Sequence, residues 1–167
     1  GVMIVAKNNF THLELAKQFR VHSIRRRYIA LVKGRVEFKE GMVDLPIKRH
    51  PFHRKKMAVS FEPGAKSAQT RYGTLKRFEG FSLLELFPHT GRTHQLRVHL
   101  AYLKHPILGD AKYGDKNDFP RLALHAKDLG FQHPQKKQFL EFSSPLPPEM
   151  QAAIGEMNVS SSSVLKQ

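Results

Sequence analysis

The alternation and clustering of apolar positions along this chain predict both strands and helices. Short apolar runs rich in β-branched residues, bounded by glycine, proline or charged residues, are typical of strands. Segments with this pattern are Val2–Lys7, Arg25–Gly34, Gly41–Pro51, Phe81–Pro88 and Lys136–Phe142, the third as an edge or loop piece because it contains proline. Two further alternating segments flank Pro63-Gly64 and predict a β-hairpin, while residues 121–131 fit either a strand or a helix.

Three segments have features of helices. In the first, Thr11 stands three residues before Glu14, which is the spacing of a capping box with Thr11 as N-cap. The second covers Arg92–Lys104, where three leucines recur at positions i, i+4 and i+7. The third begins at the Pro147-Pro148 pair, because proline is favoured in the first turn of a helix.

These elements predict the α+β class, with a mixed, mainly antiparallel sheet and flanking helices. We find no internal repeat and no linker, and a length of 167 residues suits one domain with a sizeable core. The domain is expected to cover residues 1–156. Residues 157–167 are rich in serine and are expected to form a flexible tail.

The charge of the chain predicts a polyanionic partner. There are 28 Lys and Arg residues against 14 Asp and Glu residues, a formal net charge of +14, and nucleic acid is the commonest partner of such a domain. No apolar run approaches the roughly 20 residues of a membrane span. Because cysteine is absent, disulfides and thiolate chemistry are excluded. We expect a cytoplasmic monomer without membrane association.

Common catalytic and cofactor motifs do not fit this sequence. His94 and His99 are five residues apart, which places them on different sides of a helix, and no histidine set has a metal-site spacing. The glycines near Asp110 form neither a phosphate loop nor a dinucleotide fingerprint. Asp110 is interpreted as a turn residue, and Asp44 as a strand-edge residue. Neither a metal nor a cofactor is expected.

Two residues distinguish the basic clusters from ordinary solvated surface. Tyr28 follows three arginines and begins an apolar strand, so its ring is expected to be half-buried with a free hydroxyl. Arg97 lies between helix positions that face the core, so its guanidinium is expected to be partly buried. A buried arginine needs a carboxylate partner. None of the five aspartates is an obvious partner by sequence.

Four segments together resemble the RluA-type (large ribosomal RNA) pseudouridine synthases. They are RRYIALVKG, GAKSAQTRYGTL, ELFPHTGRTHQLRVHLAYLKHPILGDAKYG and RLALHAKDLGFQHP. The resemblance runs from Gly1 to about Pro145. It implies an enzyme that isomerises uridine to pseudouridine in RNA without a cofactor, on a sheet-rich α+β fold. Ribosomal RNA is the implied substrate, with transfer RNA as an alternative.

The resemblance also assigns roles to residues. Tyr28 matches the active-site tyrosine that packs against the target base and assists proton removal at C5. Arg97 matches the arginine that pairs with the catalytic aspartate, and Leu124 matches an apolar wall of the uracil pocket. Residues expected to contact the RNA are Arg26, Arg27, Arg92, Thr93, His94 and Gln95.

The sequence departs from the family pattern at the nucleophile. The family's catalytic aspartate lies in an H-R-L-D-x-x-T-S-G motif, and Gly1 matches the last glycine of that motif. We therefore expect the nucleophile to lie upstream of Gly1 and this chain alone to be inactive. The alternative is a non-catalytic RNA-binding or ribosome-assembly module that reuses the fold. A plain basic ribosome-associated protein would leave Tyr28 and Arg97 unexplained.

Overall fold

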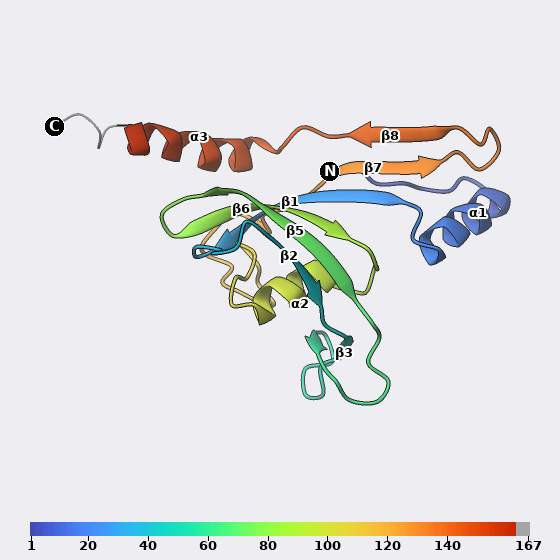
Figure 1. Ribbon diagram of the computed structural model, residues 1–167, viewed down its shortest axis with the longest axis horizontal. Helices are drawn as coiled ribbons and strands as arrows, with labels where there is room; N and C mark the ends of the chain where they lie inside the picture. Colours follow the sequence, from blue (N-terminus) through green and yellow to red (C-terminus); the bar gives the residue numbers. More distant parts are fainter. Residues whose placement is uncertain (163–167) are drawn as a thin grey trace.

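A six-stranded antiparallel sheet forms the centre of the protein. The computed structural model describes residues 1–162, with side chains through Gly155 (Figure 1). The helices are α1 (Asn9–Arg20), α2 (Gln95–Tyr102) and α3 (Pro148–Ser162). The strands are β1 (Arg25–Lys33), β2 (Glu40–Asp44), β3 (Ile47–Arg49), β4 (Met57–Val59), β5 (Gln69–Arg77), β6 (Phe81–Pro88), β7 (Leu124–Gln132) and β8 (Phe139–Ser143).

The strand order is β2-β5-β6-β1-β7-β8, and β3 pairs with β4 in a separate two-stranded sheet. Every strand pair within the described residues is antiparallel. The predicted α+β class with a mainly antiparallel sheet is therefore confirmed. In Figure 1, α2 lies below the central strands, and the β3 hairpin projects beyond it.

The main apolar core lies around β1, which is buried from Ile29 to Val32. Leu96 and Leu100 of α2 and Met150 of α3 belong to this core. A strand that is buried on both faces has consecutive apolar residues in its sequence. β1 and β6 contain such runs because consecutive residues of both strands are buried. Among the described residues, no helix is long and apolar enough to cross a membrane.

Three predicted elements are corrected by the structure. Residues 2–7 are not a strand, because only Val2 bonds to β7, through its N–H and the Ala126 carbonyl at 2.9 Å. The N-cap of α1 is Asn8, whose side chain accepts from the N–H of Thr11, instead of Thr11 itself. The segments around Pro63-Gly64 do not form a hairpin, because β4 pairs with β3 and β5 pairs with β2 and β6.

The bounds of three other elements differ from, or are narrower than, those predicted from the sequence. The helix predicted over Arg92–Lys104 is α2, which begins only at Gln95 because residues 92–94 form a turn. The ambiguous segment at 121–131 contains strand β7. Helix α3 continues through Ser162 into the predicted tail. Residues 163–167 lie outside the described part of the chain.

Candidate active site

A cavity of about 180 Å³ lies where β1, β7 and the start of α2 meet. We call it the tyrosine cavity. It gathers several of the predicted site residues although they are far apart in sequence. Its lining consists of Arg26, Tyr28, Pro88, Thr90, Gly91, Arg92, His94, Gln95, Leu96, Arg97 and Leu124.

Strand pairing places Tyr28 and Leu124 together. Tyr28 lies opposite Ala126 of β7, and Ala30 lies opposite Leu124. Because alternate residues of a strand share a face, Tyr28 and Leu124 lie on the same side of the sheet. The Tyr28 ring is half-buried, as predicted, and its hydroxyl makes no hydrogen bond to the described residues. A flat ring and an apolar wall suit a planar base.

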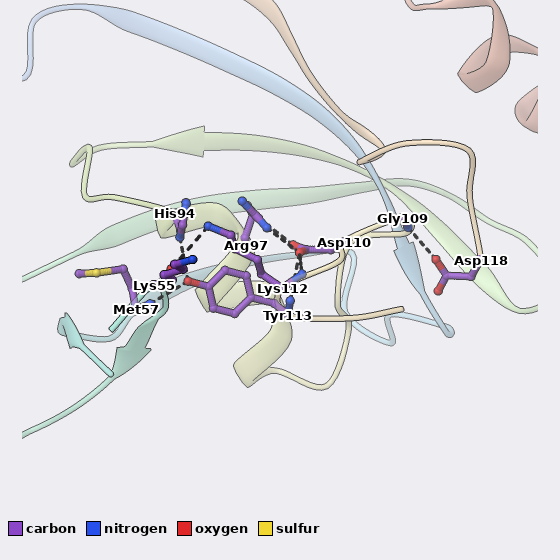
Figure 2. Close-up of polar contacts among 9 residues, drawn as sticks. All are labelled: Lys55, Met57, His94, Arg97, Gly109, Asp110, Lys112, Tyr113 and Asp118. Carbon is purple, nitrogen blue, oxygen red and sulfur yellow. Dashed lines mark hydrogen bonds and ion pairs between the residues drawn. The ribbon is translucent and has the colours of Figure 1, made fainter. Parts of the chain in front are cut away.

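The carboxylate that pairs with Arg97 belongs to this chain. This corrects the expectation that the carboxylate lies upstream of Gly1. Arg97 Nε donates to Asp110 Oδ2 at 2.8 Å, and Nη2 donates to Oδ1 at 2.7 Å (Figure 2). The Arg97 side chain is 16% exposed and that of Asp110 is 0% exposed. The sequence correctly predicted partial burial and the need for a carboxylate. It missed the partner because Asp110 also fits an ordinary turn.

Asp110 does hold that turn. Its Oδ1 accepts from the backbone N–H groups of Lys112 and Tyr113 at 2.9 and 3.0 Å. Burial alone would raise the pKa of Asp110, but the hydrogen bond from Arg97 and those two N–H groups outweigh it, so the pKa lies below its ordinary value. The same pair raises the pKa of Arg97. Both groups therefore remain charged at neutral pH.

Tyr113 connects this pair to the β3–β4 hairpin, a role that the sequence gave no sign of. Its hydroxyl accepts from the N–H of Met57 in β4 at 2.8 Å and lies 2.8 Å from His94 Nδ1 (Figure 2). The Arg97 guanidinium carbon lies 5.0 Å from the centroid of the Tyr113 ring. His94 has a φ of 57°, a left-handed conformation that costs roughly 1–2 kcal/mol in a non-glycine residue. Its contact with Tyr113 offsets part of this strain.

Gln95 shapes the loop before α2, and its amide is used inside the protein, while its contact with RNA stays a prediction. Its Oε1 accepts from Thr90 Oγ1 and from the Arg92 N–H at 2.7 and 2.9 Å. Its Nε2 donates to the Gln69 carbonyl and to Thr70 Oγ1 at 2.9 and 3.0 Å. All four hydrogen bonds of a primary amide are thus made inside the protein.

Arg26 and Arg27 differ in position. Arg26 Nη2 donates to the carbonyls of residues 88, 89 and 90 at 3.0, 3.0 and 3.3 Å, which fixes the loop after β6. Arg27 bonds to Glu85 and Asp128 at 3.0 and 3.1 Å. Arg27 does not line the tyrosine cavity. Its expected contact with the RNA stays a prediction. Its charge is neutralised by the two carboxylates.

Arg92 and Thr93 line a second cavity beside the first. This cavity, of about 470 Å³, also includes Lys48 and Arg49 of β3, and it shares Gly91 and Arg92 with the tyrosine cavity. Arg92 Nε donates to the Ser67 carbonyl at 2.9 Å. Burial, followed by repulsion from Arg97 and Lys112, lowers the pKa of His94, so this histidine is neutral at neutral pH. The positive charge of the site therefore comes from arginine and lysine.

Residues 1–155 contain no group of three or more His, Asp or Glu side chains that could hold a metal ion. The tyrosine cavity is lined by one phenol, several guanidinium groups and an apolar wall. Such a cavity can bind a flat base and an anion side by side.

Comparison with known sequences gives a consistent result. The sequence profile described as RNA pseudouridylate synthase matches residues 1–102. The RNA pseudouridine synthase YlyB of Bacillus subtilis is 41% identical over 152 residues, which cover 90% of this chain and 50% of that protein. Ribosomal large subunit pseudouridine synthase D of Nitrosomonas europaea is 42% identical over 92% of this chain and 47% of its own length. The chain thus spans about half the length of these relatives.

Solved structures share the fold. Human RNA pseudouridylate synthase domain containing 4 superposes with a TM-score of 0.75 at 27% identity, covering 95% of this chain and 71% of that chain. Human RNA pseudouridylate synthase domain containing 1 gives a TM-score of 0.73 at 25% identity, covering 92% of this chain and 74% of that chain.

Proposed function

Since this chain belongs to the RNA pseudouridylate synthase family, we propose that it binds and positions a uridine of ribosomal RNA for isomerisation to pseudouridine. The observation that carries the proposal is the convergence of Tyr28, Leu124 and Arg97 on one cavity. A uridine in a structured RNA must leave its stack to enter such a cavity, which costs a few kcal/mol. The net charge of +14 supplies the sequence-independent part of the affinity.

In this proposal the base lies between the Tyr28 ring and Leu124. The glycosidic bond from C1′ to N1 breaks, the base rotates, and a bond forms from C1′ to C5. The proton on C5 leaves, and N1, which keeps the electron pair of the broken bond, takes up a proton. The free hydroxyl of Tyr28 is the group of the cavity that is suited to assist removal of the C5 proton. Arg97 is held by Asp110 through Nε and Nη2, so its Nη1 stays available for a second anion.

We assign that second anion to the nucleophilic aspartate of the reaction. No carboxylate lines the tyrosine cavity among the described residues, and Asp110 is fully buried and bonded to Arg97. Our proposal therefore assigns the nucleophile to polypeptide outside these 167 residues. It follows that the chain by itself binds RNA without converting uridine.

The test measures tritium release from RNA carrying 5-tritiated uridine, using the enzyme that contains this chain and the 167-residue chain alone. Tyr28→Phe is expected to lower turnover by about 100-fold or more while leaving stability unchanged, since the hydroxyl has no partner to lose. Tyr102→Phe is the matched control, because Tyr102 is 52% exposed on α2.

Two results would contradict parts of the proposal. Turnover by the 167-residue chain alone would refute the assignment of the nucleophile. RNA binding without turnover in either protein would instead favour the non-catalytic RNA-binding module.

A further inference from the structure

A larger cavity lies on the opposite face of the sheet from Tyr28. This cavity, of about 580 Å³, is lined by side chains of β1, β2, β5, β6, β7 and β8 and of the segment before β1, and we call it the arginine groove. Tyr28 pairs with Leu86, and the next residue of β6, Phe87, faces the other side of the sheet together with its partner Arg71 of β5. Arg26 and Pro88 line both cavities, so the two cavities adjoin at the start of β1.

The arginines of the groove differ in how their charges are satisfied. Arg27 is neutralised by Glu85 and Asp128. Arg25 and Arg71 make no ion pair with any described residue, and each guanidinium instead lies on an aromatic ring. The Arg71 guanidinium carbon is 4.1 Å from the centroid of Phe87, and that of Arg25 is 5.0 Å from the centroid of Phe139.

Arg26 adds an unused donor where the two cavities adjoin. Its Nη2 is occupied by three backbone carbonyls, but its buried Nε has no hydrogen-bond partner among the described residues. Burial lowers the pKa of this guanidinium, although it remains charged at neutral pH. The guanidinium of Arg26 therefore adds positive charge where the two cavities adjoin.

The groove offers a surface that is flat, apolar and cationic at once. Met42 and Phe87 provide the apolar part, and Arg71 covers the Phe87 ring. An unpaired nucleotide combines a planar base with a phosphate, and proteins bind such nucleotides by stacking on aromatic rings and guanidinium planes within a positive groove. An acidic polypeptide would satisfy the charge but not the planar apolar surface.

We propose that the arginine groove binds an unpaired nucleotide that flanks the target uridine in the same RNA strand. The base stacks on Arg71 and Phe87, and the phosphate is bound by Arg25. This inference rests on the proposed RNA substrate and adds a second nucleotide site on the other face of the sheet.

The experiment measures binding of a fluorescent single-stranded oligoribonucleotide to the chain as a function of salt concentration. Each phosphate contact contributes about 0.7 to the slope of log affinity against log salt for single strands. Arg25→Gln/Arg71→Gln removes the contact of Arg25 with the one bound phosphate and is therefore expected to lower the slope by about 0.7. Lys33→Gln/Lys116→Gln is the matched control, because both lysines are exposed and Lys33 lies at the far end of β1.

A second variant separates stacking from charge. Phe87→Leu keeps an apolar side chain but removes the ring, so it is expected to weaken binding at least about fivefold at every salt concentration without changing the slope. Equal slopes for the groove variant and the lysine control would overturn the proposal while leaving the tyrosine cavity untouched. A polyglutamate competition gives a second way to overturn the proposal. It would be overturned if polyglutamate bound the unmodified chain but not the groove variant, while both bound RNA with the same affinity. No RNA binding by the unmodified chain would refute the proposed function itself.

Discussion

Replacing Asp110 with asparagine tests whether the buried pair with Arg97 stabilises the fold. The Asp110 side chain is 0% exposed and forms two charge-assisted bonds with Arg97 and two with backbone N–H groups. Removing one partner of a buried ion pair typically costs about 3–5 kcal/mol, because the other charge is left uncompensated. Asparagine keeps one oxygen for the two N–H groups, so we expect about 3 kcal/mol, the lower end.

This cost is measurable by denaturation. For a domain of this size, 1 kcal/mol lowers the melting temperature by about 2–4 °C, so Asp110→Asn is expected to lower it by about 6–12 °C. Urea unfolding should show a lower midpoint with an unchanged m-value. Arg97→Met combined with Asp110→Asn should destabilise the protein by less than the sum of the two single changes, because the double variant leaves no uncompensated charge.

The acid dependence of stability provides an independent check. The pKa of Asp110 is lowered in the folded state. Its contribution to the free energy of unfolding is therefore complete above the ordinary pKa of about 3.9 and is lost as the pH falls through the pKa of the folded state. The stability of Asp110→Asn should lack this part of the acid dependence. Glu149→Gln, which breaks the more exposed pair with Arg121, is the control and should leave the melting temperature nearly unchanged. A loss below about 1 kcal/mol in Asp110→Asn would refute the reasoning.

Two further predictions concern the core and a turn. Burial lowers the pKa of His99, whose neutral ring bonds to Thr70 and Leu45, so unfolding takes up a proton and the free energy of unfolding should fall as the pH drops below about 6.5. Urea titrations at several pH values should show a shallower dependence in His99→Gln, and an unchanged slope would contradict this. Gly109→Ala should destabilise by more than about 3 kcal/mol, since φ is +69° and the new Cβ would lie 2.1 Å from the Arg121 carbonyl oxygen. Gly80→Ala, with a φ of +81° and open space around it, should cost only about 1–2 kcal/mol, and equal melting temperatures for the two variants would refute the steric argument.

The candidate site was partly predictable from local patterns. The arginine run followed by an apolar strand located Tyr28 and gave its half-burial, and the leucine spacing located Arg97 on a helix. The role of Gln95 was not predictable, because its four hydrogen-bond partners come from the loop before α2 and from β5. A polar side chain in a basic segment looks the same in sequence whether it faces solvent or completes a buried network.

The sequence by itself determined the positions of the central strands β1 and β6, the location of α2, the family and the excess of positive charge. These features depend on local periodicity, on composition and on a contiguous motif. Tertiary structure alone decided that Asp110 neutralises Arg97, that Glu85 and Asp128 neutralise Arg27, and that β4 pairs with β3. The physical reason is that charge pairing and strand pairing depend on distance in space, and the folded chain brings together residues whose separation in sequence carries no sign of that contact.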